Sequence, residues 1–445
     1  MDRKKTTSTL TLKNTVYANP EKGADLDAPT TDPISSIFKL LKSTIGVANV
    51  FDIRLSLPSH LIDPVSALEF WQYMDRPDLF ACLSDSDDEV FRFLGIIRFW
   101  FSKDSKWKNH AIRKPYNPIL SEFFTCHWNT TSASPVSPHT RSPSLTSESS
   151  SSATSDETAD IVTINDEKEE VKVHYIAEQI SHHPPMSAYY FECVEKGVVA
   201  RGVDHLAGKF TGTSFRIGPG EFNGGIFVNL KQRDEEYNLT HPQAAVAGFM
   251  TGSIYIACAD KCIITCPKTN LKCIIEYKEE SFFGKPKFAI EGKVYRYDSK
   301  KDALLTPAER AKNDKLAKVD DGDVVAVVYG AWNGRVWYRL VGDETDHLLI
   351  DVAESVIPDK SVRDEHLQHE NESRRVWKHV TEALLRKDYN KANLEKRKVE
   401  DEQRAKAAEN AKNGVKVESQ FFDFEHPSKP TLKKSVKLGD LIQQK

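Results

Sequence analysis

The sequence predicts an α+β fold built on a large antiparallel β-sheet. The first observation is a long run of short strands between about residues 123 and 350, separated by turns that contain Gly, Asn, Asp and Pro. Such spacing is typical of an antiparallel meander. The second observation is apolar residues at helical spacing on both sides of this run. So many strands form either two sheets or one closed barrel, and a barrel of this size can hold a ligand.

The expected strands are short and rich in β-branched and aromatic residues. They cover residues 123–128, 171–180, 188–194, 199–203, 209–217, 225–230, 236–239, 248–258, 261–266, 272–278, 289–297 and 324–332, with weaker candidates at 337–341 and 348–350. The charged stretch 299–321 is expected to be a long hairpin loop.

The N-terminal region is expected to be a polar tail followed by an amphipathic helix. Residues 1–30 lack periodicity and should be disordered. Asp32-Pro33 then supplies an N-cap and a proline at the first helical position. The apolar side chains that follow at helical spacing are Ile34, Ile37, Phe38, Leu41 and Ile45. This stripe either packs on the core or, when it is exposed, contacts a bilayer.

Further helices are expected on both sides of the strands. One begins at Asp63-Pro64, and a strongly apolar one covers residues 90–101. After the strands, an apolar stripe predicts a helix over residues 373–385, and a charged helix follows over residues 390–411. Residues 426–445 are expected to be a C-terminal tail.

Residues 129–160 are rich in Ser and Thr and cannot bury enough apolar surface to offset the entropy of ordering. They are expected to form a disordered insert between two strands. The insert contains Ser134-Pro135, Ser137-Pro138 and Ser142-Pro143, which are sequences that proline-directed kinases modify. Phosphates there would add negative charge and weaken docking on anionic membranes. An unmodified spacer fits the composition equally well.

The composition and charge of the chain argue against a nucleic-acid-binding, membrane-spanning or secreted protein. The chain has 445 residues and a net charge of −4, so no basic field argues for a nucleic acid partner. No apolar run approaches the roughly 20 residues that cross a bilayer. The N-terminus lacks the apolar stretch of a secretory signal. These features favour a cytoplasmic protein whose membrane contacts are peripheral.

The seven cysteines favour reduced thiols, because an odd number in such a compartment does not indicate a disulfide framework. Cys258, Cys262 and Cys266 recur every four residues and would share one face of a strand. A zinc site usually contains more closely spaced pairs. We therefore expect small buried apolar residues and no metal or cofactor.

The most specific stretch is residues 178–188, in which His182 and His183 stand between Ser181 and two prolines. Proline fixes the backbone φ and pushes the preceding residue towards an extended shape. The pair should therefore lie on a stiff loop or strand end. Two imidazoles held in this way can donate hydrogen bonds to an anion such as a phosphate.

Two stretches resemble the oxysterol-binding-protein-related family of lipid-transfer proteins. Residues 178–185 match its Glu-Gln-x-Ser-His-His-Pro-Pro signature without a gap. Residues 114–122 are similar to its Lys-Pro-x-Asn-Pro-x-Leu-Gly-Glu, with Ser121 where the family usually has Gly. The resemblance implies a barrel with a central lipid tunnel over residues 55–425, and a lid over residues 31–54.

The resemblance also implies a set of residues that binds a lipid head group. The family's phosphate-binding positions correspond to Lys114, Asn117, His182, His183, Lys396, Glu400 and Arg404. Lys396, Glu400 and Arg404 are four residues apart and form one stripe on a helix. From the residues alone, this stripe is more typical of a solvated helix face, and it is the resemblance that favours a binding role.

The implied function is carriage of lipids between membranes. Phosphatidylinositol 4-phosphate would bind with its head at the tunnel mouth, and a sterol or phosphatidylserine would compete for the same tunnel. A sensor or scaffold that binds lipid without transfer is the alternative. The expected setting is an anionic membrane surface of the endoplasmic reticulum, Golgi or plasma membrane.

The sequence bears on two further interpretations. An enzyme is not favoured, because no metal cluster or nucleophile elbow accompanies the two histidines. Residues 420–425 slightly resemble a two-phenylalanine motif that docks on anchor proteins of the endoplasmic reticulum. A final strand that anchors these phenylalanines in the core is the simpler interpretation.

Overall fold

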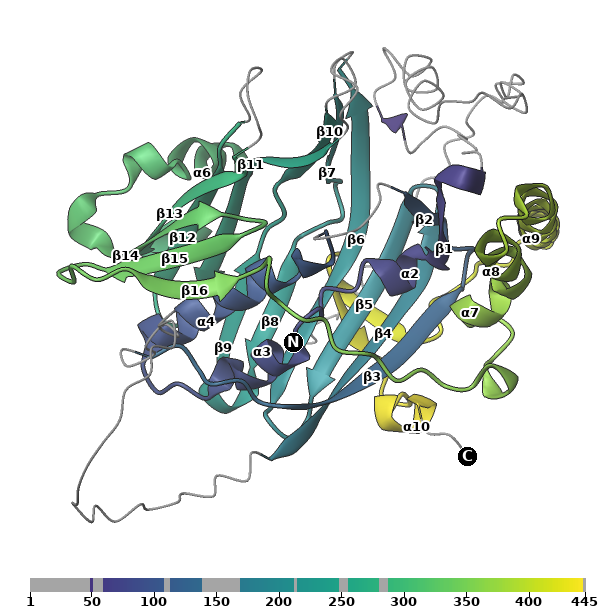
Figure 1. Ribbon diagram of the computed structural model, residues 1–445, viewed down its shortest axis with the longest axis horizontal. Coiled ribbons are helices and arrows are strands. Elements are labelled where there is room, and N and C mark those ends of the chain that lie inside the picture. Colours follow the sequence, from purple (N-terminus) through teal and green to yellow (C-terminus); the bar gives the residue numbers. More distant parts are fainter. Residues whose placement is uncertain are drawn as a thin grey trace, which may run out of the picture.

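A fourteen-stranded antiparallel sheet forms the centre of the molecule in the computed structural model (Figure 1). The structure describes residues 49–50, 59–107, 113–137, 169–211, 214–247, 255–279 and 287–442. Helices α3 (Pro77–Ala81) and α4 (Glu89–Ser102) lie against one face of the sheet. The predicted α+β class with a large antiparallel sheet is confirmed.

The strands of this sheet follow one main path with a side branch. They are β3 (Phe123–Thr131), β4 (Glu170–His182), β5 (Pro185–Cys193), β6 (Val198–Phe210), β7 (Phe215–Pro219), β8 (Ile226–Leu230), β9 (Glu235–Leu239), β10 (Gln243–Ala247), β11 (Tyr255–Cys266), β12 (Leu271–Tyr277), β13 (Ala289–Arg296), β14 (Val324–Ala331), β15 (Arg335–Leu340) and β16 (His347–Asp351). The main path runs β3, β4, β5, β6, β7, β10 and then β11 to β16 in sequence order. A second route between β6 and β11 passes through β8 and β9.

Strand pairing does not close the sheet into the predicted barrel. Within the described residues, the end strands β3 and β16 are not paired with each other. The chain after β16 instead lies along the free edge of β3. There the backbone N–H of Phe123 donates to Asn371 at 3.0 Å, and that of His127 donates to Ser361 at 3.0 Å. A loop therefore covers the edge that a closed barrel would pair.

Helix α4 fills the inner side of the sheet. Its N-cap is Asp88, whose side chain accepts hydrogen bonds from the backbone N–H groups of Val90 at 2.8 Å and Phe91 at 3.1 Å. Side chains on all sides of this helix are buried, including Trp100. A helix that is apolar all round must be surrounded by protein. The strongly apolar helix predicted over residues 90–101 is confirmed.

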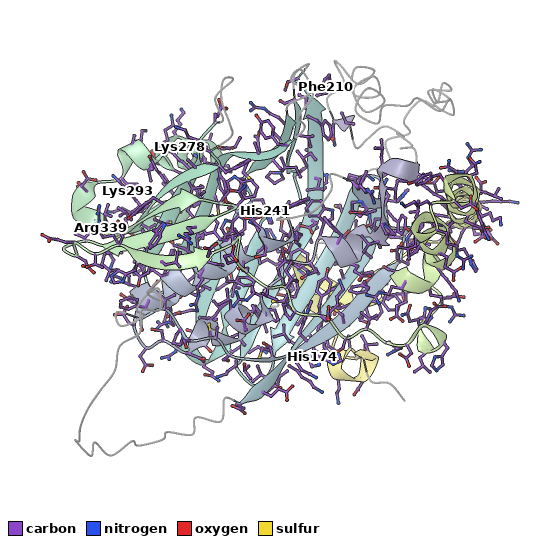
Figure 2. The ribbon with its side chains drawn as sticks, viewed as in Figure 1. His174, Phe210, His241, Lys278, Lys293 and Arg339 are labelled. Atoms are coloured by element: carbon purple, nitrogen blue, oxygen red, sulfur yellow. The ribbon has the colours of Figure 1, made fainter. Side chains whose placement is uncertain are left out.

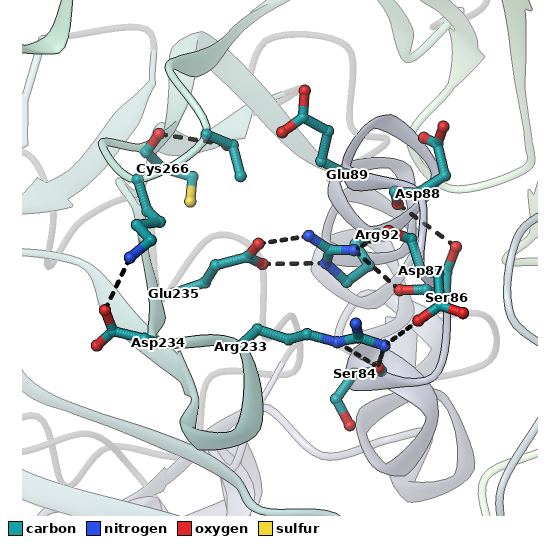
Figure 3. A network of polar contacts seen from close by, with 12 residues as sticks. Ser84, Ser86, Asp87, Asp88, Glu89, Arg92, Arg233, Asp234, Glu235 and Cys266 are labelled. Atoms are coloured by element: carbon teal, nitrogen blue, oxygen red, sulfur yellow. Dashed lines mark hydrogen bonds and ion pairs between the residues drawn. The ribbon is translucent and has the colours of Figure 1, made fainter.

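A buried ion pair fastens α4 to the sheet (Figure 3). Arg92 makes a two-pronged contact with Glu235, in which its Nε donates at 3.1 Å. The hydroxyl of Tyr237 donates to the same carboxylate at 2.7 Å. Arg92 also donates to the carbonyl of Asp87 at 2.6 Å, and Arg233 reaches the Asp87 side chain at 2.7 Å. The start of α4 is thus held to β9 and to the turn before it.

The structure corrects several of the expected elements. Residues 209–217, expected as one strand, are divided between the end of β6 and β7, and β11 runs through residues 259–260, where a break was expected. Strand β3 extends to Thr131, into the insert expected from residue 129. The stretch at Asp63-Pro64 begins no helix but belongs to β1 (Ile62–Ser66), which pairs in parallel with β2 (Lys114–Tyr116). The residue before a proline avoids the helical region, and that preference prevailed here. The expected hairpin loop 299–321 contains two short helices whose N-caps are Asp298 and Thr306.

The other helices are short, except for α9. They are η2 (Ser59–Leu61), α2 (Ala67–Phe70), η3 (Cys82–Ser84), η4 (Ser105–Trp107), η5 (Lys231–Arg233), α5 (Ser299–Ala303), α6 (Pro307–Asn313), η6 (Leu316–Lys318), η7 (Asp321–Asp323), η8 (Glu365–Leu367), α7 (Ser373–Val376), α8 (Lys378–Leu385), α9 (Tyr389–Lys412) and α10 (Leu438–Ile442). The two predicted helices after the sheet correspond to α7 with α8 and to α9.

The C-terminal residues do not form the expected tail. Strands β17 (Phe422–His426) and β18 (Lys429–Leu432) form a hairpin, and α10 follows it against β3 and β4. Phe421 and Phe422 are buried in a cluster with Phe123 and Met186 on the outer side of the sheet. Burial of this phenylalanine pair agrees with the core-anchor interpretation.

Three of the expected segments fall outside the described residues. They are the tail 1–30, the lid stripe with Ile34, Ile37, Phe38, Leu41 and Ile45, and residues 138–160 of the insert. Among the described helices, none is long and apolar enough to cross a membrane.

Candidate functional site

The segment that contains Lys114 and Asn117 is organised by the buried carboxylate of Glu122. This side chain accepts hydrogen bonds from Ser66 at 2.5 Å, the Ile119 N–H at 2.9 Å, Ser373 at 2.7 Å and Trp377 at 2.9 Å. Those donors come from β1, from the segment itself, from α7 and from the junction of α7 with α8. One carboxylate therefore fixes the segment against the C-terminal helices.

Ser121 adopts a left-handed backbone with φ of 65°. This is the position at which the resembled family has Gly, and it is the shape that Gly adopts without cost. The Ser121 N–H donates to the backbone carbonyl of Gln179 at 3.0 Å, and the Gln179 N–H donates to the backbone carbonyl of Glu122 at 2.8 Å. The unusual backbone thus places the Lys114 segment beside the end of β4.

Four of the predicted head-group residues lie together. The ammonium group of Lys114 donates to the side-chain oxygen of Asn117. Lys396 and Glu400 form an ion pair of 2.9 Å on α9. The pKa of Lys114 is lowered to about 8, chiefly by burial and also by the charge of Lys396, whereas the charge of Glu400 raises it. Such mutual influence requires proximity, so β2 and α9 contribute to one cluster.

Aromatic packing brings α9 to β2. The rings of Tyr116 and Trp377 stack with centroids 4.5 Å apart, and the Tyr116 hydroxyl lies 2.9 Å from that of Thr381. Helix α8 packs against α9, where Ala392 is buried in the same apolar cluster. The predicted stripe of Lys396 and Glu400 is therefore held over the Lys114 segment.

The two signature histidines lie at a tight turn between β4 and β5. His182 ends β4, the peptide bond from His183 to Pro184 is cis, and the two rings are 4.7 Å apart. Inside the turn, Gln179 donates to the Ser181 carbonyl at 2.7 Å and accepts from Ser187 at 2.6 Å. The predicted strand end is confirmed, and the Ser121–Gln179 bond connects it to the Lys114 segment.

Arg404 is arranged differently from the prediction. Glu400 was expected to lie between Lys396 and Arg404 and to orient both of them. The structure pairs Glu400 with Lys396, whereas Arg404 pairs with Asp401 one turn earlier and is half exposed. An i, i+3 partner on the same helix thus takes the place of the i, i+4 partner.

A buried polar cluster inside the sheet was not predicted. The Tyr73 hydroxyl donates to Asp204 at 2.7 Å, and its ring is 5.2 Å from that of Tyr189 and 5.4 Å from that of His241. The Tyr189 hydroxyl and the Nε2 atom of His241 are buried, and neither has a hydrogen-bond partner among the residues that the structure describes. Figure 2 shows His241 near the middle of the molecule. Unpaired buried polar atoms are uncommon in native structures and call for an explanation.

The electrostatics of this cluster follow from its burial. Burial raises the pKa of Asp204 to about 7, although its hydrogen bond from Tyr73 works in the opposite direction. Burial lowers the pKa of His241 to about 3, so this imidazole is neutral. The strand period gives a signal that was overlooked, because Asp204 has the same parity in β6 as the inward-facing Val198 and Ala200.

The cysteines behave as expected from the sequence. Six of the seven free thiols are buried, and Cys258 is partly buried. Burial raises the pKa of Cys258 to about 12. Among the residues that the structure describes, no group of three or more His, Cys, Asp or Glu side chains is arranged to hold a metal ion.

Comparison with known proteins identifies the family. The sequence profile of the oxysterol-binding proteins matches residues 36–308. The chain belongs to the oxysterol-binding protein family. It is 33% identical to oxysterol-binding protein-like protein 1 of Schizosaccharomyces pombe, over 89% of this chain and 88% of that protein. Human oxysterol-binding protein-related protein 9 is 28% identical over 91% of this chain, which spans 49% of the human protein.

Solved structures of the family share the fold. The Osh1 ORD domain in complex with cholesterol superimposes with a TM-score of 0.63 at 18% identity, over 91% of this chain and 88% of that one. The Osh3 ORD of Saccharomyces cerevisiae in complex with PI(4)P gives a TM-score of 0.60 at 15% identity, over 89% and 90%. Proteins of this family bind lipids and are not enzymes, in agreement with the non-catalytic interpretation of the sequence.

Proposed function

We propose that this oxysterol-binding protein extracts phosphatidylinositol 4-phosphate from one membrane and exchanges it for a second lipid. The observation that carries the proposal is the meeting of Lys114, Asn117 and Lys396 beside the histidine turn. Lys114 and Lys396 lie close enough for their positive charges to oppose each other, and Lys396 pairs with Glu400 at 2.9 Å. A phosphorylated inositol would bring further negative charge to these cations and accept several charge-assisted hydrogen bonds.

The pKa of Lys114 supports this assignment. Its ammonium group is partly buried and close to a second cation, Lys396, and the carboxylate of Glu400 offsets only part of these effects, because the pKa of Lys114 is still lowered. A bound phosphate would compensate both charges. His182 and His183 would then supply further donors from the adjacent turn. Arg404, which pairs with Asp401, would have to exchange that partner for the ligand.

The buried polar cluster supports a sterol as the second lipid. A sterol has a single hydroxyl at one end of an apolar body. That hydroxyl can donate to Asp204 and accept from the unpaired hydroxyl of Tyr189. Phosphatidylserine would bring several charges to a cluster whose histidine is neutral. The chemistry of the cluster therefore favours a sterol over phosphatidylserine.

The test is a liposome assay in which the purified protein extracts and transfers phosphatidylinositol 4-phosphate. Lys396→Ala removes one charge-assisted contact and should weaken extraction about 10- to 100-fold, which corresponds to about 1.5–3 kcal/mol. Lys398→Ala is the matched control, because Lys398 lies on the same helix and pairs with Glu395 at 3.0 Å. Equal activity of the two variants would contradict the assignment.

Two further measurements complete the test. The double variant with His182→Ala and His183→Ala should lose phosphatidylinositol 4-phosphate extraction, and retained extraction would contradict the role of the turn. Tyr189→Phe should weaken sterol transfer and leave phosphatidylinositol 4-phosphate extraction intact. Binding of the phosphoinositide without transfer between liposomes would indicate the sensor or scaffold alternative.

A further inference from the structure

Arg98 is a partly buried arginine with no acidic partner among the described residues. On α4, its Nη2 atom donates to the carbonyl of Ser134 at 2.8 Å and contacts the Cys82 sulfur at 3.2 Å. Its Nε atom is buried and has no hydrogen-bond partner. Removing a guanidinium from water is costly unless an anion pairs with it. Because Arg98 is only partly buried, part of this cost is avoided, and a negatively charged group that reached the guanidinium would remove the rest.

Arg98 also lines a surface pocket of about 280 Å³ between α3, α4 and the end of β16. The pocket residues are Arg76, Leu79, Arg98, Leu349, Ile350, Asp351, Glu354 and Ser355. Two of its charges are already paired, since Arg76 binds Asp78 at 2.6 Å and Asp351 binds Arg335 at 2.8 Å. Arg98 is thus the cation of the pocket that has no carboxylate against it, and Glu354 is an acidic group on the same wall.

The chain passes next to this guanidinium at a Ser-Pro sequence. Ser134 is exposed and lies just beyond the end of β3, and Pro135 follows it in the sequence. The carbonyl that Arg98 holds belongs to Ser134 itself. Val136, two residues later, is buried in the core and is 4% exposed. The exposed serine is therefore held, through its own carbonyl, beside an arginine that has no acidic partner among the described residues.

We propose that Ser134 is a phosphorylation site whose phosphate is received by Arg98. A proline-directed kinase would transfer the γ-phosphoryl group of ATP to the serine oxygen, releasing ADP and the hydroxyl proton. The phosphate oxygens accept from the Nη side of the guanidinium, which already contacts the Ser134 carbonyl, and form the strong contact that arginine makes with phosphates. The modification compensates the charge of a partly buried arginine and ties the start of the Ser/Thr-rich insert to α4.

The proposal differs from the general effect of phosphates in the insert. A phosphate on a solvated serine adds charge without a partner. A phosphate on Ser134 neutralises a cation that the fold already contains. It should therefore stabilise the folded protein, and the stabilisation should depend on Arg98. Glu354 opposes the phosphate, so Glu354→Gln should increase the stabilisation.

The experiment treats the full chain with a proline-directed kinase and ATP and locates the phosphate by mass spectrometry. Thermal unfolding and a phosphorus NMR titration are then measured for modified and unmodified protein. We expect a higher unfolding temperature after modification. We also expect the second pKa of the phosphate to fall below its ordinary value of about 6. Both changes should disappear in Arg98→Gln and persist in Ser137→Ala.

Each protein is compared with its own unmodified form, so a general destabilisation by Arg98→Gln cancels. Arg98→Lys serves as a second variant, because it keeps the charge and loses the forked geometry. A phosphate found on Ser137 and not on Ser134 would overturn the proposal. Equal shifts in wild type and Arg98→Gln would also overturn it. Inorganic phosphate that binds at Arg98 while Ser134 resists modification would replace it with a site for free anions.

Discussion

Replacing Asp204 with Asn is expected to stabilise the protein at neutral pH more than at acid pH. Burial raises the pKa of this carboxyl from its ordinary 3.8 to about 7. The folded state therefore retains a proton that the unfolded state has released, and stability falls as the pH rises from about 4 to about 7. Asn cannot ionise, and its side-chain oxygen can still accept the hydrogen bond from Tyr73.

The size of the effect follows from the two pKa values. At about 1.4 kcal/mol for each pH unit, their difference corresponds to about 4 kcal/mol. The Asp204 side chain keeps some accessible surface, so solvent reduces the cost of its charge. We therefore expect roughly 2 kcal/mol, about half of the full value.

Urea unfolding of wild type and Asp204→Asn at pH 4 and pH 8 measures this effect. Other groups titrate in both proteins, so the difference between their free energies of unfolding is the quantity compared. The free energy of unfolding of the variant, relative to that of wild type, should be higher at pH 8 than at pH 4 by roughly 2 kcal/mol. Tyr73→Phe is the control, because it keeps the acid and should retain the pH dependence. A difference that does not vary with pH would refute the described burial of Asp204.

Three further predictions concern the head-group cluster and the framework. Phosphatidylinositol 4-phosphate binding should weaken as the pH rises through about 8, the lowered pKa of Lys114, and Lys114→Arg should shift this loss to higher pH in a liposome binding assay. Glu235→Gln should lower the free energy of unfolding by about 3 kcal/mol, because it leaves the buried Arg92 without a charge partner. The double variant with Arg92→Met and Glu235→Met should lower it less, and urea unfolding measures both changes. Ser121→Val should destabilise by more than about 1 kcal/mol and Ser121→Gly should not, since φ is 65° there.

Much of the sheet was predictable because its strands alternate between a buried and an exposed face. In β4, for example, Val171, Val173 and Tyr175 point inwards while Lys172 between them is exposed. Turn residues between the strands gave most of the boundaries. The helix α4 was also predictable, since a long apolar run ends at polar residues on both sides.

The failures have identifiable physical causes. The pair Asp63-Pro64 carries signals for both a helix start and an extended strand, and pairing with β2 decided between them. A final strand at the phenylalanine pair was expected, but β18 and α10 lie in residues 426–445, which were expected to be a tail, and they are ordered by packing on residues far away in the chain, such as Met186. Long-range packing of this kind leaves no local pattern.

In the candidate site, too, residues on local motifs were predictable, and contacts that depend on distant or competing partners were not. The residues on stiff local motifs, His182 and Asn117, lie where their sequence context places them. Arg404 has two acidic neighbours on its own helix, and spacing alone does not decide which of them it binds. Asp204 was overlooked because one carboxylate in a strand says nothing about its partner, and Tyr73 is 131 residues away.

The loop that covers β3 has a consequence for solubility. An exposed edge strand offers unpaired N–H and C=O groups to any other extended chain and so invites aggregation. The backbone bonds of Phe123 to Asn371 and of His127 to Ser361 occupy part of that edge within the same molecule. The proposed exchange of lipids would expose apolar surfaces of this protein to other copies of itself. Because part of the β3 edge is already paired with a segment of the same chain, fewer unpaired backbone groups are left there for another copy to bind.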